Sequence, residues 1–237
     1  AELPFLSDSA EALSVAYQRV HDEMLAGANE HEGVKLLAVF THGPGMIFTT
    51  AEPVDELVDL SGKKMRVGGG LANLVAERLN VVPVSAPSPQ VFEILSNRVA
   101  DGIFFPAESV PFFRIDTVLK HGTSVPGGLY NTSFFIVMNR NSWAALSDED
   151  KAAIEALSGE ALARRAGQAW DAADAKGLEK MQTEGIDLIA ADDALAGALR
   201  ERLSGLDIVF LTAAEAKGID GAAALARLRE EIAKETN

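Results

Sequence analysis

The feature that most constrains the fold is a long run of helix-forming residues from Ser147 to about Glu184. Ser147 is a good helix N-cap, and the acidic residues at 148–150 fill the first turn, where the helix dipole favours negative charge. A straight helix of this length would measure roughly 55 Å, whereas a lobe of about 100 residues has a radius of gyration near 13 Å. The candidate kink positions are Gly159, Gly167 and Gly177. The run therefore predicts a helix that either kinks or spans two lobes.

Upstream of this run, the chain repeats a strand–helix–strand pattern. One unit covers residues 64–85 and contains a short strand, three consecutive glycines at 68–70, an amphipathic helix and a second strand. The next unit has a helix that starts at Pro89 and a strand from Val99 to Phe105. The other predicted elements are a helix from Ser7 or Ser9 to about Asn29, strands over 34–40, 46–50, 134–138, 186–190 and 208–211, and Ala-rich helices near the C-terminus. This order indicates an α/β fold.

Composition and charge exclude several classes of protein. The 237 residues carry a net charge of −14. An acidic surface repels nucleic-acid phosphates and anionic lipid headgroups, so neither kind of partner is expected. The absence of cysteine rules out disulfides, thiolate nucleophiles and cysteine zinc sites. No apolar run approaches the roughly 20 residues that a transmembrane helix needs.

The sequence lacks the spacing of catalytic or metal-binding motifs. The four histidines (His21, His31, His42 and His121) show no metal-ligand spacing and are interpreted as surface or loop residues. No Gly-x-Ser-x-Gly nucleophile elbow occurs. The acidic residues at 148–150 fit a solvated helix start better than a metal site. We therefore expect no catalytic residues, no metal and no cofactor, and we expect that the protein is not an enzyme.

The glycines at 68–70 have three interpretations. A nucleotide site is disfavoured because Asn73 stands where a Gly-x-Gly-x-x-Gly fingerprint needs its third glycine, and no Gly-Lys-Ser/Thr loop occurs. A tight turn with permissive backbone angles is the simplest interpretation. The third is an anion site, because Arg66 stands just before the glycines and its planar fork matches a carboxylate. From the residues alone, a carboxylate site and a surface ion pair of Arg66 are equally supported.

Aromatic residues and prolines gather in the connections between residues 104 and 134. Phe105 is the candidate pocket residue, because Pro106 ends its strand and ligands of α/β proteins bind outside the carboxyl ends of strands. Side chains alternate along a strand, so Phe104 should face the opposite side. The alternative is that Phe105 packs within its own lobe.

Four segments, in this order along the chain, resemble the DctP family, the solute-binding proteins of TRAP transporters. Residues 3–5 (LPF) resemble the family's LPF/LPY segment, and residues 59–67 (DLSGKKMRV) resemble its DLKGLKIRV stretch. Residues 99–106 (VADGIFFP) resemble its VDGQENP stretch, and residues 139–147 (NRNSWAALS) resemble its N-x-x-x-W/Y-x-x-L-P/S segment. The resemblance implies a two-lobe periplasmic-binding-protein-like fold with a hinge and a long helix spanning both lobes. It also implies a periplasmic protein, expected to be a monomer, that captures a small organic carboxylate and delivers it to the membrane subunits of a TRAP transporter.

Departures from the family pattern bear on the ligand. Arg66 matches the arginine that pairs with the ligand carboxylate, but a second basic position of many members falls at Gly45, and the asparagine before proline falls at Phe105. An aromatic position of sialate-type members falls at Ser88. A hydroxyl-rich ligand would leave polar groups unpaired in such a pocket, at ~1–3 kcal/mol each. The resemblance therefore favours an apolar or aromatic monocarboxylate over sialic acid or a dicarboxylate.

These considerations assign candidate residues and lobes. The candidate ligand-binding residues are Arg66, Gly68, Ser88, Phe105, Tyr130, Asn131 and Gly45. Lobe I is assigned to residues 1–45 and 128–160, lobe II to 46–127 and 185–211, the spanning helix to 147–184, and C-terminal helices to 212–237. Lobe I is incomplete by this division, because the family's N-terminal strand–helix–strand region has no counterpart, and a segment upstream of Ala1 is expected.

Two other functions stay open at this point. An α/β enzyme with a Rossmann-like site would need a phosphate-binding loop, and bound nucleotide would then absorb in the ultraviolet. The effector domain of a transcription regulator would need a DNA-binding segment upstream of this sequence.

Overall fold

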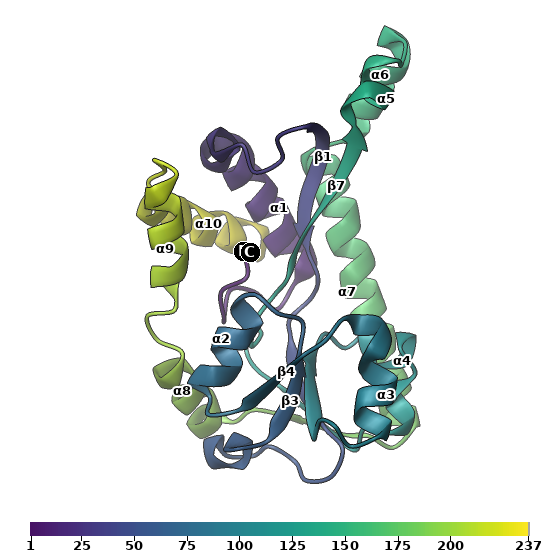
Figure 1. Ribbon diagram of the computed structural model, residues 1–237, viewed down its shortest axis with the longest axis vertical. Helices are drawn as coiled ribbons and strands as arrows, with labels where there is room; N and C mark the ends of the chain where they lie inside the picture. The colour runs from purple at the N-terminus through teal and green to yellow at the C-terminus, as the bar shows by residue number, and fades with distance from the viewer. Residues whose placement is uncertain (237) are drawn as a thin grey trace.

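In the computed structural model, which describes residues 1–236, six of the eight strands form one mixed sheet in the lower lobe of Figure 1, here called lobe II. The strands of this sheet are β2 (Met46–Thr49), β3 (Lys64–Val67), β4 (Val82–Ser85), β5 (Gly102–Phe105), β6 (His121–Ser124) and β8 (Asp187–Ala190). Their order is β4-β3-β5-β2-β6-β8. Because β3 is parallel to both β4 and β5, the carboxyl ends of these three strands meet at one edge of the sheet.

The upper lobe, lobe I, contains the other two strands. β1 (Val34–Thr41) and β7 (Ser133–Asn139) form an antiparallel pair whose register shifts between Leu36 and Ala38. The helices α1 (Ala10–Val20) and α7 (Glu160–Thr183) pack against β1, and α10 (Gly221–Thr236) packs against α1. The chain crosses from lobe I to lobe II between β1 and β2 (residues 42–45) and returns between β6 and β7 (residues 125–132), and these two connections are here called the chain crossings. It later enters lobe II again through α7 and returns to lobe I before α10 (Figure 1).

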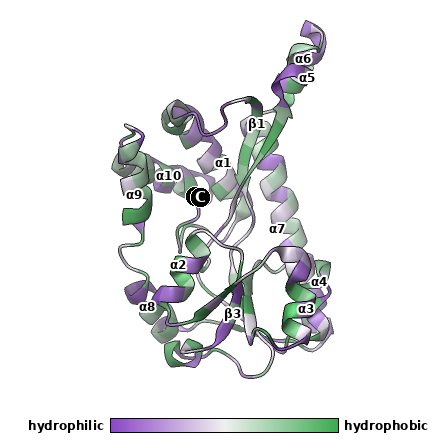
Figure 2. Cartoon of the chain, in the orientation of Figure 1, coloured by the Kyte–Doolittle hydropathy of each residue, from purple (hydrophilic) through white to green (hydrophobic). Residues whose placement is uncertain are grey.

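The remaining helices are short and connect or cover the strands. They are α2 (Leu71–Arg78), α3 (Val91–Ser96), α4 (Ser109–Phe112), α5 (Arg140–Ala144), α6 (Asp148–Leu157), α8 (Asp193–Arg202) and α9 (Asp207–Ala216), with single turns η1 (His21–Leu25), η2 (Ala26–Ala28), η3 (Leu57–Leu60), η4 (Ser88–Gln90) and η5 (Ile115–Thr117). Hydrophilic and hydrophobic residues alternate along α7 and α10 (Figure 2), as expected for helices with one face on the core. Among residues 1–236, no helix combines the length and the apolar character needed to cross a membrane.

The two faces of the lobe II sheet bury different hydrophobic clusters. Ile47 of β2 and Phe104 of β5 belong to one cluster, whereas Phe48 and Phe105 belong to the other. This is the alternation predicted for Phe104 and Phe105, and it follows from the two-residue repeat of a strand. On β3, Met65 and Val67 face the first cluster, so the side chain between them projects toward the second.

The long helical run is interrupted, so the prediction of one helix from Ser147 to Glu184 is wrong. It consists of α6 and α7, separated at Ser158 and Gly159. Ser158 is extended, Gly159 has a φ of 63°, and the Gly159 N–H donates to the Leu37 carbonyl of β1 at 2.6 Å. The break lies at Gly159, one of the three kink positions proposed from the sequence. The second helix, α7, is long enough to reach both lobes without α6: it contacts α1 and β1 in lobe I, and α4 and β8 in lobe II.

Glycines let α7 approach both lobes closely. A Cβ at Gly167 would lie 2.4 Å from Glu11 Cα in lobe I, and a Cβ at Gly177 would lie 2.6 Å from the Ala107 carbonyl oxygen in lobe II. Between these two contacts, Asp171 accepts hydrogen bonds from Ser9 Oγ at 2.8 Å and from the Ala10 N–H at 2.6 Å, at the start of α1. α7 therefore packs closely against the backbone of both lobes.

A second correction concerns residues 208–211, which were predicted to form a strand. They belong to α9, which begins at Asp207 and runs through the helix-forming residues up to Ala216. A four-residue apolar run has no measurable period and suits either a strand or one turn of a helix. The predicted boundary between lobe II and the C-terminal helices at 211/212 consequently falls inside this helix.

Candidate ligand-binding site

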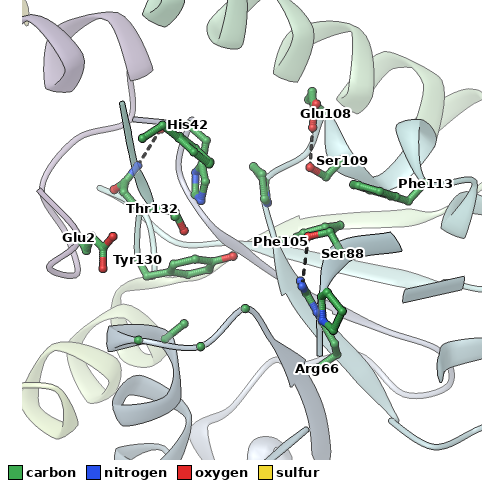
Figure 3. A pocket seen from close by; sticks show the side chains of 18 of the residues that line it. Glu2, His42, Arg66, Ser88, Phe105, Glu108, Ser109, Phe113, Tyr130 and Thr132 are labelled. Atoms are coloured by element: carbon green, nitrogen blue, oxygen red, sulfur yellow. Dashed lines mark hydrogen bonds between the residues drawn. The ribbon is translucent and has the colours of Figure 1, made fainter. Parts of the chain in front are cut away.

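A cavity of about 640 Å³ lies where the two lobes meet. Its walls come from the carboxyl ends of β3 and β5, the loops after β3 and β4, the start of α4, the two chain crossings between the lobes, and the middle of α7. This volume is in the range of sites for small molecules. Figure 3 views the cavity from close by, with Arg66 at one end and His42 at the other.

Arg66 is the cationic group of the cavity. Its position on β3 turns it to the same face of the sheet as Phe105, and its residue is 2% exposed. Nε and Nη2 donate to the Ala86 carbonyl at 3.0 and 2.7 Å, and Nη2 also donates to Ser88 Oγ at 3.1 Å. These bonds orient the guanidinium, and burial lowers its pKa from the usual value.

Arg66 forms no ion pair with any carboxylate of residues 1–236. The two acidic side chains that line the cavity bond elsewhere: Glu2 Oε1 accepts from the Ser133 N–H and Oγ, and Glu108 Oε2 accepts from Ser109 Oγ. A buried charge is costly unless it is paired. The guanidinium is therefore suited to pairing with an anion that enters the cavity.

The glycines after β3 form the tight turn that the sequence indicated. Gly69 has a φ of 107° and Gly70 a φ of 58° with a ψ of −136°, conformations that residues with a Cβ rarely adopt. Gly70 is the N-cap of α2, and residues 68–70 all line the cavity. Asn73, which breaks the nucleotide fingerprint, accepts a hydrogen bond from Ser85 Oγ at 2.9 Å.

Aromatic rings form much of the remaining surface. The Phe105 ring lies beneath the guanidinium, with Arg66 Cζ 4.9 Å from the ring centroid, and packs against Phe113 at 5.6 Å. At another wall, Phe134 of β7 and Trp170 of α7 are stacked with centroids 6.0 Å apart and planes inclined by 8°. The cavity can therefore enclose a flat apolar group.

His42 lies in the crossing between β1 and β2 and was not expected in the site. The sequence placed it among surface or loop residues; it is in a loop, but it is 4% exposed and lines the cavity. Its Nδ1 contacts the Gly43 carbonyl, and its ring packs edge-on against Tyr130 at 5.5 Å. Burial lowers the pKa of the imidazole to about 4.

The structure brings six of the seven predicted residues to the cavity. They are Arg66, Gly68, Ser88, Phe105, Tyr130 and Asn131. Gly45 is not among the residues that line the cavity: its N–H donates to the Tyr130 carbonyl at 2.9 Å, and a Cβ there would lie 2.3 Å from Tyr130 Cε1. Gly45 leaves space for the Tyr130 ring. Contact of the six with a ligand stays a prediction.

Sequence reasoning missed several of the lining residues contributed by lobe I and the interlobe elements. The main ones are His42, Thr132 and Trp170, whereas Phe134 belongs to the aromatic cluster that the sequence indicated between residues 104 and 134. A signal existed for Trp170, which stands near the middle of the predicted spanning helix, and for His42, which directly follows a predicted strand at a turn.

Comparisons with known proteins agree with this geometry. The sequence matches the DctP family, described as bacterial extracellular solute-binding protein, family 7, over residues 1–206. A protein from Comamonas testosteroni named outer membrane transporter protein TsaT is 31% identical over 234 residues, which cover 98% of this chain and 69% of that protein.

Two crystal structures are similar over nearly the whole chain. A TRAP periplasmic solute-binding protein from Bordetella bronchiseptica, with bound (R)- and (S)-mandelate, is 45% identical with a TM-score of 0.95, covering 100% of this chain and 75% of that one. A marine metagenome TRAP solute-binding protein specific for aromatic acid ligands, in complex with metahydroxyphenylacetate, is 34% identical with a TM-score of 0.90, covering 98% and 73%. The two-lobe arrangement of this chain is thus the fold of TRAP solute-binding proteins.

Proposed function

Because this chain belongs to the DctP family of bacterial extracellular solute-binding proteins, we propose that it captures a small aromatic monocarboxylate in the periplasm and passes it to the membrane subunits of a TRAP transporter. The similar proteins from Bordetella bronchiseptica and the marine metagenome hold mandelate and metahydroxyphenylacetate. Both ligands combine one carboxylate with one aromatic ring.

The observation that carries this proposal is the buried guanidinium of Arg66. It is 2% exposed, it is oriented by the Ala86 carbonyl and Ser88 Oγ, and none of residues 1–236 supplies a carboxylate to it. A ligand carboxylate would provide charge-assisted hydrogen bonds to the fork of an arginine. Formation of this pair would offset the desolvation of the cation.

The rings around the cavity support an aromatic ligand. Phe105 lies directly beneath Arg66, and the stacked pair of Phe134 and Trp170 offers another flat surface. Aromatic pairs contribute about 0.5–1.5 kcal/mol beyond the area that they bury. A sugar acid would place several hydroxyls against these rings without partners, at a cost of about 1–3 kcal/mol each.

The family consists of binding proteins, and we extend this to the chain itself: it binds its ligand without transforming it, acts as a monomer and has no nucleic-acid partner. The net charge of −14 supports the last point. The acidic groups of the cavity, Glu2 and Glu108, are held in hydrogen bonds with Ser133 and Ser109.

Calorimetry with benzoate, phenylacetate and mandelate, against succinate and glucuronate, tests the proposal. We expect the aromatic acids to bind and Arg66→Ala to weaken them by at least about 30-fold, since truncating one partner of a buried charge pair costs about 2–5 kcal/mol. Arg66→Lys should restore little, because an ammonium cannot reproduce the fork. The control is Arg202→Ala, at an exposed position in lobe II. Near-native affinity of Arg66→Ala, or preference for succinate or glucuronate, would refute the proposal.

A further inference from the structure

The end of the cavity opposite Arg66 holds a histidine whose proton position is set by its neighbour. His42 Nδ1 contacts the Gly43 carbonyl oxygen. A carbonyl oxygen only accepts hydrogen bonds, so the proton of the neutral ring is on Nδ1 and the lone pair is on Nε2. The ring is neutral near pH 7, because burial lowers the pKa of His42 to about 4. None of residues 1–236 donates a hydrogen bond to Nε2.

The surroundings keep this acceptor in place. Asn131, which is 2% exposed, donates from Nδ2 to the carbonyls of both His42 and Gly43 at 3.0 Å. The imidazole also contacts the rings of Tyr130 at 5.5 Å and Trp170 at 5.9 Å between centroids. Both the backbone and the ring of His42 are therefore fixed before a ligand arrives, and Asn131 acts as a positioning residue.

The two ends of the cavity have complementary chemistry. Figure 3 shows His42 at the upper left and Arg66 at the lower right, with the Tyr130 ring below His42 and to the left of Arg66. The Arg66 end offers donors to an anion, whereas the His42 end offers a neutral acceptor. An acceptor that a ligand buries without supplying a donor to it costs free energy. A ligand with only a carboxylate and a hydrocarbon ring would satisfy Arg66 and leave Nε2 unpaired.

We propose that His42 Nε2 accepts a hydrogen bond from a hydroxyl on the ligand ring, remote from the carboxylate. This proposal rests on the proposed function. The preferred ligands are then ring-hydroxylated aromatic monocarboxylates. A hydroxyl next to the carboxylate, as in mandelate, would lie at the Arg66 end and would not reach this acceptor. The inference thus assigns affinity for the acid to Arg66 and selection for the hydroxyl to His42.

Matched ligand pairs test this assignment by calorimetry on the whole chain. The probes are 3- and 4-hydroxybenzoate against 3- and 4-methylbenzoate, because a methyl group has the size of a hydroxyl but cannot donate. We expect the protein to prefer at least one hydroxybenzoate over its methyl analogue by about 5- to 100-fold. In His42→Phe this ratio should fall to about one, while the affinity for the methylbenzoate changes much less. The control His121→Phe, at a histidine outside the cavity, should keep the ratio.

Two results would overturn the inference: equal affinity for both members of each pair, or an unchanged ratio in His42→Phe. In either case the hydroxybenzoates and methylbenzoates still bind, and the proposed function stands. Failure of all four ligands to bind would refute the proposed function itself. Should His42→Phe not fold, nitrogen NMR of histidine-labelled protein replaces it. The His42 Nε2 resonance should then move with the preferred hydroxybenzoate and not with its methyl analogue, and equal movement with both would also reject the inference.

Discussion

The two walls of the cavity are built in different ways. One wall, the strand wall, consists of Arg66, Ser88 and Phe105, which lie at or just after the carboxyl ends of adjacent strands in one sheet. The other, the crossing wall, consists of His42, Tyr130, Asn131 and Trp170, which lie on the two chain crossings and on α7. The strand wall carries a cation, whereas the crossing wall is neutral and presents an acceptor.

This difference separates two tasks. The geometry of the strand wall is fixed inside lobe II by strand pairing, so it does not depend on how the lobes are oriented. The crossing wall belongs to the elements between the lobes, which are the ones that move when two-lobe proteins close by hinge or shear motion. We therefore expect the strand wall to bind the carboxylate, and the crossing wall to determine which carboxylate ligands are preferred.

The largest expected effect concerns Asp174, a buried carboxyl where α7 passes the first crossing. It is 8% exposed, Oδ1 accepts from the Glu108 N–H at 2.8 Å, and Oδ2, against Gly43, has no partner among residues 1–236. Burial, with the nearby carboxylates of Glu108 and Asp171, raises its pKa to about 7. The folded protein therefore holds a proton that the unfolded chain releases near pH 4.

The stability of the protein should fall as pH rises through this window. The native state binds more protons than the unfolded state between about pH 4 and pH 7, so the free energy of unfolding decreases with pH there by up to about 4 kcal/mol. Asp174→Asn should remove this slope and stabilise the protein at pH 8, as measured by urea unfolding at several pH values. Asp148→Asn, at an exposed carboxyl, is the control. An identical pH slope in Asp174→Asn would show that Asp174 is ionised in the fold.

A smaller effect on stability is expected from adding a methyl group where α7 contacts lobe II. In Gly177→Ala, the new Cβ would lie 2.6 Å from the Ala107 carbonyl oxygen, next to the loop that follows Phe105. We expect a loss of about 1–3 kcal/mol in the free energy of unfolding, because overpacking outweighs the better helix propensity of alanine. The preference for a hydroxybenzoate over its methyl analogue, assigned to the crossing wall, should decrease more than the affinity for a carboxylate.

The matched control is Gly197→Ala in α8, where a Cβ would meet no atom within 4 Å. That variant should gain about 0.5–1 kcal/mol from helix propensity alone. If Gly177→Ala were stabilised to the same extent in chemical unfolding, α7 would not be tightly seated on lobe II, and the crossing wall would not depend on that contact.

The sequence predicted all three residues of the strand wall, but only Tyr130 and Asn131 of the four in the crossing wall. Phe105 and Arg66 could be placed because strand alternation, strand ends and the glycine turn are local patterns, and the family resemblance added Ser88. His42 and Trp170 could not, because their burial depends on how α7 and the crossings pack across the lobes. The position of Gly45 outside the cavity lining depends on packing in the same way, since the Tyr130 ring fills the space in front of it.

The smallest expected effect tests the strand wall through Phe105. In Phe105→Leu the cavity keeps an apolar side chain but loses the ring beneath the Arg66 guanidinium, 4.9 Å away. Cation–π and aromatic contacts of this kind contribute about 0.5–1.5 kcal/mol beyond buried area. Benzoate should therefore bind about 2- to 12-fold more weakly, whereas cyclohexanecarboxylate, which has the same carboxylate but no aromatic ring, should change little.

The ratio of these two affinities is the decisive quantity, because it cancels any general damage to the cavity. Phe92→Leu is the control for the same substitution outside the cavity, on α3, where the side chain is 43% exposed. If Phe105→Leu weakened benzoate and cyclohexanecarboxylate equally, Phe105 would contribute apolar area alone. Recognition of an aromatic ring would then belong to the crossing wall, through Tyr130 and Trp170, and the strand wall would contribute little beyond the charge of Arg66.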